Sequence, residues 1–556
     1  MGEILKKYML LTEKYQIPLK IAVIQWFITT VLQVDRAFFI YEYETKCFWI
    51  VKFFYFMFLV IAWSFGFNVY KQLKSENLEY KRGVQIFVIY FSIVMGMLLI
   101  VWPGTWSWDD LWTLDVIKHY SEFNAWQHII TGLYQDVMLQ ILPFPGGIIF
   151  LQNVIISICV AFSITKLEKI FPLFRIKNTI LDVVLKSIPF LLPPVLLYQF
   201  SGYRIGLYVY LEVAVLILLV CLYKENKKWT WKGILLFSFL VIIVSCWRTE
   251  SFIYIPFFGI LILFAHESVI TFRKKIICIL FFSVGFIGMT KWQSYETGNN
   301  NYQIVSTLRP CVELIRHADY VKDEKELTTI NKVLDLNIIY ENPSLNGENL
   351  YWGTGCVRTR NTDPLDDYSD MDYKNYLRAF IKLAIRYPKI VIKERVELFM
   401  SSIGMKGECV RNTNKAVELF DVNSENEIAK RTQKMKWIAN TPVCKKFRKS
   451  VISLLDGKNI LKKIIWNAAI PIIALIVLWG KTLIHKNKYL CMLITSVIIR
   501  IPLVVLTQPS NWFMYFLSFY LLGYIVVVYE IWIYFSKIVH YNKKSRCGYI
   551  IVEEKK

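Results

Sequence analysis

Residues 84–112 read VQIFVIYFSIVMGMLLIVWPGTWSWDDLW, an apolar run that ends among four tryptophans and two adjacent aspartates. No charged residue occurs between Val84 and Trp108, so this run is long enough to cross a hydrocarbon core of about 30 Å as a helix. Indole rings collect at the headgroup level, whereas a carboxylate near hydrocarbon is costly unless it is solvated, paired or used. The stretch therefore predicts a membrane-spanning helix followed by a loop where chemistry takes place.

The composition of the whole chain agrees with a membrane protein. Of 556 residues, 55% are hydrophobic and 16% are aromatic, well above the usage of soluble domains. The net charge of +22 comes from Lys and Arg gathered in short loops between apolar runs, where they set topology and attract anionic headgroups. We therefore expect membrane lipid as a partner and no nucleic acid.

Similar apolar runs recur along the chain and predict an all-α polytopic membrane protein. The N-terminal segment shows no small-residue cleavage site, so the first run is expected to serve as an anchor. About twelve spans are expected, near residues 17–34, 48–69, 84–102, 145–165, 179–199, 205–223, 233–247, 250–265, 276–290, 464–480, 489–507 and 512–535.

The basic loops place both termini in the cytoplasm, provided that residues 126–142 do not cross the membrane. In that stretch His128, Thr131 and Gln135 share one helical face and apolar residues share the other. This pattern is typical of a helix lying in the interface plane, and a thirteenth span is the alternative.

Three parts of the chain are expected. Residues 1–290 form an N-terminal transmembrane module whose outer loop is 103–144, residues 291–463 form an extracytoplasmic, mainly helical domain, and residues 464–556 form terminal spans and a cytoplasmic tail. Four cysteines of the outer domain are either free thiols or two disulfides, in any of three pairings: Cys311, Cys356, Cys409 and Cys444.

Asp109 and Asp110 are the candidate catalytic residues. Neighbouring side chains of a helix point about 100° apart, so the two carboxylates are not expected to act as a symmetric pair. One can act as a general base while the other holds a hydroxyl, a cation or a helix end. The alternatives are a solvated loop charge for Asp109 and an N-cap of a helix beginning near Leu111 for Asp110.

Four cationic or polar residues on the same side are candidates for binding a phosphate. Guanidinium groups suit phosphate, and an arginine at membrane depth normally faces a cavity or an anion. The candidates are Arg204, Arg248, Arg500 and His128. The alternatives are an internal ion pair, for example Arg248 with Glu250, or snorkelling to the interface, and for His128 an interfacial residue at the start of a helix.

This arrangement resembles the GT-C class of polyprenyl-phosphate-sugar glycosyltransferases, such as protein O-mannosyltransferases and lipid A aminoarabinose transferases. The likeness covers the whole chain as architecture, but only residues 102–140 as motif. It implies a catalytic base at Asp109 or Asp110. A His-Pro pair maps to His128, although Ile129 stands where the class has proline. The class often has a second acidic residue in the next outer loop, where this chain has Tyr203-Arg204, with Glu212 about two turns further on.

The resemblance implies inverting transfer of a sugar from a polyprenyl-phosphate donor to a glycan, lipid or protein acceptor, on the extracytoplasmic face of a multi-pass cell-membrane protein. Richness in Lys, Ile and Asn indicates a low-GC bacterium, for which the donor lipid is undecaprenyl phosphate and the acceptor a cell-envelope polysaccharide. A divalent cation stays open as a cofactor. The segment Gln508–Tyr515 resembles the start of the last span in bacterial members. The rivals are a polysaccharide polymerase or ligase, a polytopic transporter, and a membrane binding or scaffold protein.

Overall fold

The structure is a computed structural model that describes most of the chain. It covers residues 2–40, 46–106, 108–120, 128–171, 173–225, 228–297, 304–342, 350–351, 353–358, 368–406 and 464–553. Within these residues there is no β-strand, and the only extended pairings are two isolated bridges, Thr105 with Ser201 and Leu334 with Val357. The predicted all-α class is confirmed for the described part of the chain.

Seven of the described helical segments are long and apolar enough to cross a membrane. They are α2 (Lys46–Lys74), α3 (Leu78–Ile100), α6 (Pro145–Ile170), α9 (Arg204–Lys224), α12 (Phe272–Thr297), α24 with α25 (Lys488–Ile498 and Arg500–Thr507), and η6 with α26 (Phe513–Phe516 and Leu517–Glu553). Four shorter apolar helices also coincide with predicted spans: the end of α1 (Gly2–Val31), α10 (Trp231–Trp247), α11 (Tyr254–Phe264) and α23 (Ala469–Ile484). Length and composition thus establish seven membrane-spanning candidates, against about twelve expected.

One expected span is broken into three short pieces. Residues 179–199 form α7 (Thr179–Lys186), η2 (Ile188–Leu191) and α8 (Pro193–Gln199). Pro189 and Pro193 lie in the first turns of η2 and α8. Proline lacks an amide hydrogen and is tolerated in the first turn of a helix, so each proline starts a new helix here rather than continuing the previous one.

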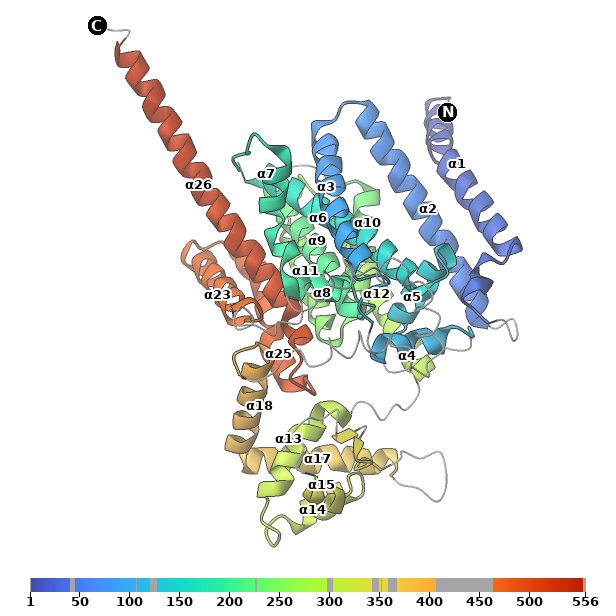
Figure 1. The fold of residues 1–556 in the computed structure, drawn as a ribbon, viewed down its shortest axis with the longest axis vertical. Helices are drawn as coiled ribbons and strands as arrows, with labels where there is room; N and C mark the ends of the chain where they lie inside the picture. The colour runs from blue at the N-terminus through green and yellow to red at the C-terminus, as the bar shows by residue number, and fades with distance from the viewer. Residues whose placement is uncertain are drawn as a thin grey trace.

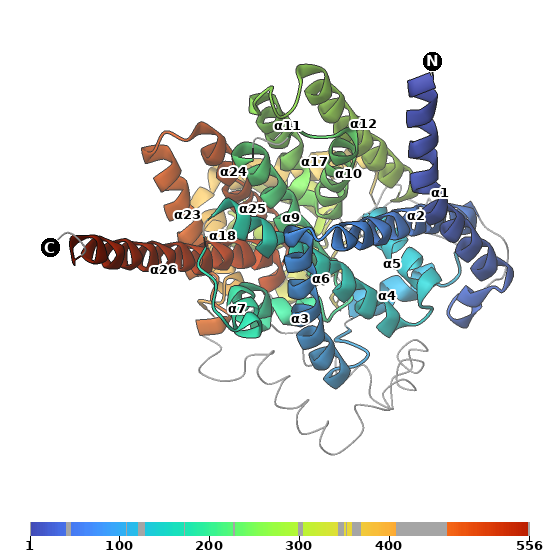
Figure 2. The ribbon, with the colours of Figure 1, turned by 90° about the horizontal axis from the view of Figure 1, so that it is seen from above.

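Helix α9 lies at the centre of the bundle. Its side chains are buried almost throughout, and it packs against α6, α8, α10, α24 and α26 (Figure 2). Helices α2 and α12 lie further out and expose many large apolar side chains, for example Phe53 and Val284. Such exposed apolar side chains are expected on helices that face lipid, because hydrocarbon solvates them as well as protein does.

The two ends of the bundle differ. Both chain termini lie at one end, together with α7, whereas α4 (Trp108–Ile117) lies at the other (Figure 1). Beyond α4 is a second hydrophobic cluster built by α13 (Val305–His317), α14 (Glu324–Asn331), α15 (Leu336–Glu341), α17 (Asp370–Arg386) and their connections. Helix α18 (Pro388–Ser402) joins this cluster to the bundle by packing against α25 and η6. The first loop and the second cluster therefore share one end of the molecule.

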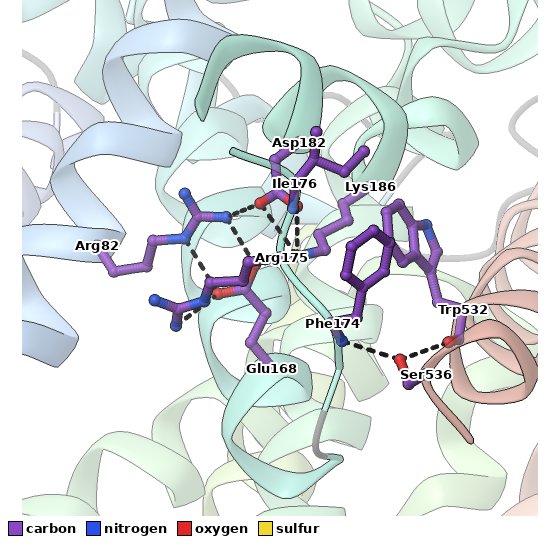
Figure 3. Close-up of polar contacts among 9 residues, drawn as sticks. All are labelled: Arg82, Glu168, Phe174, Arg175, Ile176, Asp182, Lys186, Trp532 and Ser536. Atoms are coloured by element: carbon purple, nitrogen blue, oxygen red, sulfur yellow. Dashed lines mark hydrogen bonds and ion pairs between the residues drawn. The ribbon is translucent and has the colours of Figure 1, made fainter. Parts of the chain in front are cut away.

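A buried charge cluster stabilises the end of the bundle that carries α7 (Figure 3). Lys186 of α7 pairs with Asp182 at 2.9 Å and with Glu168 of α6 at 2.9 Å, and Arg82 of α3 also contacts both carboxylates. The amide of Phe174 donates to Ser536 of α26 at 2.8 Å. Breaking one partner of a buried pair leaves an uncompensated charge, which typically costs about 3–5 kcal/mol. The cluster thus ties α3, α6 and α7 together, and the neighbouring hydrogen bond adds α26.

Candidate functional site

The loop before α4 is attached to the segment before α9. Thr105 donates its amide to the carbonyl of Phe200 at 2.7 Å and its hydroxyl to the carbonyl of Leu197 at 3.2 Å. Gly104 has a φ of +108°, and a Cβ added there would lie 2.6 Å from the Phe200 oxygen. Only glycine adopts such a backbone readily while allowing so close an approach. Two segments that are distant in sequence therefore form one unit.

Gly202 lies at the centre of this unit. A Cβ added to Gly202 would lie 2.6 Å from the Trp106 ring and 3.1 Å from the Cβ of Asp110. Asp110 is buried. Because α4 begins at Trp108, Asp110 is inside the helix and is not its N-cap. Asp109 lies in the same helical turn, but its side chain is outside the described part of the structure. The glycine thus allows the Cβ of Asp110 to approach the start of α9.

His128 is the N-cap of α5 (Ile129–Ile141). Its Nδ1 accepts a hydrogen bond from the amide of Ile130 at 3.3 Å, which assigns the proton of the neutral ring to Nε2. Nε2 is buried and has no hydrogen-bond partner in the described part of the chain. Burial and the nearby positive charge of Arg204 lower the pKa of His128 to about 4. At neutral pH the site therefore contains an unused N–H donor close to a guanidinium.

Helix α5 carries further polar atoms without partners. Thr131 and Gln135 lie on the His128 face, as the sequence pattern predicts, and the Gln135 amide reaches the carbonyl of Gly202 at 3.4 Å. Thr131 Oγ1 and Gln135 Oε1 are buried and lack hydrogen-bond partners among the described residues. The polar face of α5 thus packs towards Gly202 inside the protein, and the position of this helix in the interface plane stays a prediction.

The far end of α5 is held by a separate network. Lys52 of α2 pairs with Asp35 at 3.0 Å and donates to Gln140 of α5 at 2.7 Å. The Tyr120 hydroxyl, which follows α4, donates to Asp35 at 2.6 Å and accepts from Gln140 at 2.5 Å. These groups are buried, and hydrogen bonds inside a protein are stronger than the same bonds in water. The network fixes α5 relative to α2 and α4 and so fixes where His128 lies.

Arg248 and Arg500 are both ion-paired. Arg248 pairs with Glu250 at 2.6 Å, which was the alternative to a phosphate role, and its guanidinium lies 5.7 Å from the Tyr515 ring centre. Arg500, at the start of α25, pairs with Glu212 of α9, and both contact the hydroxyl of Tyr254. Ser518 also donates to Glu212 at 2.5 Å. Arg500 and Glu212 are each 1% exposed, so their charges neutralise each other inside the bundle.

Trp247 connects this ion-pair group to the unit around Gly202. Its indole donates to the carbonyl of Arg204 at 2.9 Å, and its ring lies 5.4 Å from that of Tyr134 on α5. The sequence analysis singled out neither Trp247 nor Gly202. The signal was present in Ser201-Gly202-Tyr203-Arg204, where a glycine between two polar segments permits close approach of another chain segment.

The structure therefore divides the predicted site residues into two groups. Asp110 packs against Gly202, and the charge of Arg204, two residues after Gly202, acts on His128, whereas Arg248 and Arg500 form an ion-pair group with Glu250 and Glu212. In the described ranges, no three His, Cys, Asp or Glu residues are grouped to hold a metal ion. Cys311 and Cys356 are free, buried thiols of the second cluster, whereas Cys409 and Cys444 lie outside the described residues.

Comparison of the chain with known protein families, with curated proteins and with solved structures gives no match.

Proposed function

We propose that this protein is a membrane glycosyltransferase that moves a sugar from a polyprenyl-phosphate donor to an acceptor on the extracytoplasmic face. One observation carries the proposal: Asp110 packs against Gly202, and the buried His128, whose Nε2–H has no partner among the described residues, feels the positive charge of Arg204, two residues after Gly202. A buried donor without a partner is costly, typically about 1–3 kcal/mol. Its persistence beside a guanidinium is accounted for by an anionic ligand.

The phosphate of the donor lipid binds between His128 and Arg204 in this proposal. The neutral imidazole donates from Nε2, and the guanidinium supplies charge and further N–H groups. As the sugar departs, the phosphate gains negative charge. Donors that are already in place stabilise this charge without reorganisation, which is the usual source of a large part of catalysis. Phosphate roles for Arg248 and Arg500 remain predictions. In this proposal their ion pairs stabilise the part of the bundle next to Arg204.

The base comes from α4. A carboxylate takes the proton of the acceptor hydroxyl as the hydroxyl oxygen attacks the anomeric carbon, and the bond to the phosphate oxygen breaks with inversion. Asp109 is the residue that we propose as base. Asp110, whose Cβ lies close to Gly202, is its alternative or a positioning residue. In this proposal the shorter apolar helices also cross the membrane, giving about twelve spans, and residues 291–463 contact the acceptor.

Transfer of radiolabelled sugar from undecaprenyl phosphate by the purified protein tests this function. Asp109→Asn should fold normally and lose about 10²-fold or more of the rate, the lower range expected for losing a general base. Asp110→Asn should cost less if it is a positioning residue. Near-normal transfer by both variants would overturn the catalytic proposal, and a loss confined to Asp110→Asn would assign the base to Asp110.

Lipid-phosphate binding is a second, independent measurement. The parent protein should bind undecaprenyl phosphate in lipid nanodiscs, and His128→Gln and Arg204→Gln should each weaken that binding. The matched control is His317→Gln, which changes an exposed histidine of the second cluster. Equal binding by the parent and both site variants would show that the unit around Gly202 does not hold the phosphate.

A further inference from the structure

A second set of unpaired polar groups lies where α18 meets the segment between α25 and η6. Gln508 caps the end of α25, and both its side-chain oxygen and its side-chain nitrogen are buried without hydrogen-bond partners in the part of the chain that is described. The hydroxyl of Ser510 is in the same state. Gln508 is 2% exposed and Ser510 is 0% exposed, so bulk water does not serve them. Groups of this kind are rare in native proteins and call for a ligand or a structural reason.

Arg395 of α18 adds a further donor at this place. Its Nη1 donates to the main-chain carbonyls of Gln508 at 3.0 Å and Leu506 at 3.3 Å. Its Nη2 has no hydrogen-bond partner among the described residues. Arg395 is only 4% exposed, so water does not replace that partner. Glu394 lies 2.5 Å from Arg395 and 2.8 Å from Arg309, so one carboxylate faces two guanidinium groups. This leaves the group with one net positive charge.

The surrounding contacts hold these groups in place. Asn511 donates to the hydroxyl of Ser401 at 3.1 Å, and the rings of Phe399 and Phe516 lie 5.3 Å apart. Both contacts join α18 to the segment around η6, and the two elements pack against each other. The unpaired atoms are therefore presented by a fixed junction, and a ligand that uses them would meet a preorganised site.

The chemistry of the unpaired atoms selects a class of ligand. They comprise an amide acceptor, an amide donor, a hydroxyl and a guanidinium N–H. A phosphate or carboxylate only accepts, so it would leave the Gln508 oxygen unsatisfied. An apolar group would leave all four unsatisfied. Neighbouring hydroxyl groups both donate and accept, so a sugar matches the whole set.

The position of this junction relative to the first site supports the same assignment. Tyr515, in the segment after Ser510, lies under the guanidinium of Arg248. Arg248 follows Trp247, whose indole binds the Arg204 carbonyl. The backbone of Arg204 is thus linked through Trp247 and Arg248 to Tyr515, which lies five residues after Ser510 in the chain.

We infer that Gln508, Ser510 and Arg395 bind hydroxyl groups of a glycan acceptor. This assignment rests on the proposed glycosyltransferase function, because the glycan would be the acceptor substrate of that reaction. The acceptor would bind where the second cluster meets the bundle. Sugar binding at this junction does not itself require the donor lipid, so the two proposals can be tested separately.

Saturation-transfer NMR of the full chain in nanodiscs, with methyl glycosides of glucose, galactose and N-acetylglucosamine as probes, tests the site. The parent protein should transfer saturation to at least one glycoside. The double variant Gln508→Met with Ser510→Ala should lose the signal by about tenfold or more, the loss expected when two buried hydrogen bonds are removed. Thr507→Ser is the matched control and should bind as the parent does, because it retains an exposed hydroxyl on the same turn.

The outcomes separate the two proposals. Absence of saturation transfer from the parent, together with undecaprenyl phosphate binding that depends on His128, would overturn the acceptor site alone. Glycoside binding that is lost in the double variant, without any lipid-phosphate binding, would support the sugar site and overturn the proposed function. A double variant that melts at a higher temperature and binds glycosides unchanged would identify the unpaired atoms as a packing defect and would refute the site.

Discussion

Trp247 donates its indole N–H to the main-chain carbonyl of Arg204, with 2.9 Å between the two atoms. This bond joins the end of α10 to the start of α9. It places the pair Arg248–Glu250 next to the segment that carries Gly202 and Arg204. Residues that are 43 positions apart in the chain thereby lie side by side next to the candidate site.

Gly202 should not tolerate a side chain. In Gly202→Ala the new Cβ meets the Trp106 ring at 2.6 Å and the Asp110 Cβ at 3.1 Å, so the loop before α4 must move. Overpacking typically costs about 1–3 kcal/mol, and we expect the melting temperature and the rate of sugar transfer both to fall. Gly96→Ala is the control, because a Cβ there meets nothing within 4 Å. Equal melting temperatures of the two variants would contradict the close contact.

His128 should make the protein less stable in mild acid. Its pKa is lowered from 6.5 to about 4 in the folded protein, so between these values the unfolded chain binds more protons than the folded one. The contribution of His128 is fully present above about pH 6.5 and is lost as the pH falls towards 4, a change on the order of 3 kcal/mol. Thermal melting of the parent and of His128→Gln at pH 7.5 and pH 5 checks this. The parent should lose more stability than the variant, and parallel losses would argue against a neutral, buried imidazole.

Arg500 and Glu212 should be needed together. Arg500→Leu leaves the Glu212 carboxylate buried without its ion-pair partner, a change that typically costs about 3–5 kcal/mol. The double variant Arg500→Leu with Glu212→Leu removes both charges and should recover part of this loss. Yield and melting temperature of four proteins provide the measurement: the parent, Arg500→Leu, Glu212→Leu and the double variant. A double variant less stable than the sum of the two single variants would show that the pair is not self-contained.

The two ends of the bundle should lie on opposite sides of the membrane. Lys325 is exposed on α14 of the second cluster, and Ser75 is exposed in the turn between α2 and α3. A membrane-impermeant thiol reagent should label Lys325→Cys in intact cells and label Ser75→Cys only after lysis. The parent protein controls for native thiols, most of which are buried among the described residues. Labelling of Ser75→Cys in intact cells would reverse or refute the proposed topology.

The sequence by itself determined the membrane class, the positions of most long helices and the helix that begins after His128, because these depend on local hydrophobic pattern and capping. It also indicated Asp110, His128 and Arg204 as candidate site residues. Placing a charged or polar group near hydrocarbon costs free energy, so such a group usually has a function. Pro193 and Pro194 interrupt the apolar run 179–199, and an average over that run predicts one span, whereas the structure divides it into α7, η2 and α8.

Only the tertiary structure decided which of these residues meet. Arg204, Arg248 and Arg500 look equivalent in the sequence, yet in the fold the charge of Arg204 acts on His128, Arg248 pairs with Glu250 and Arg500 pairs with Glu212. The partner of Arg500 is 288 positions away, and no local pattern encodes such a pairing. The polar face of α5 likewise faces water in the sequence pattern and faces protein in the fold. Helix periodicity specifies which side chains share a face, but what that face contacts depends on how distant helices pack against it.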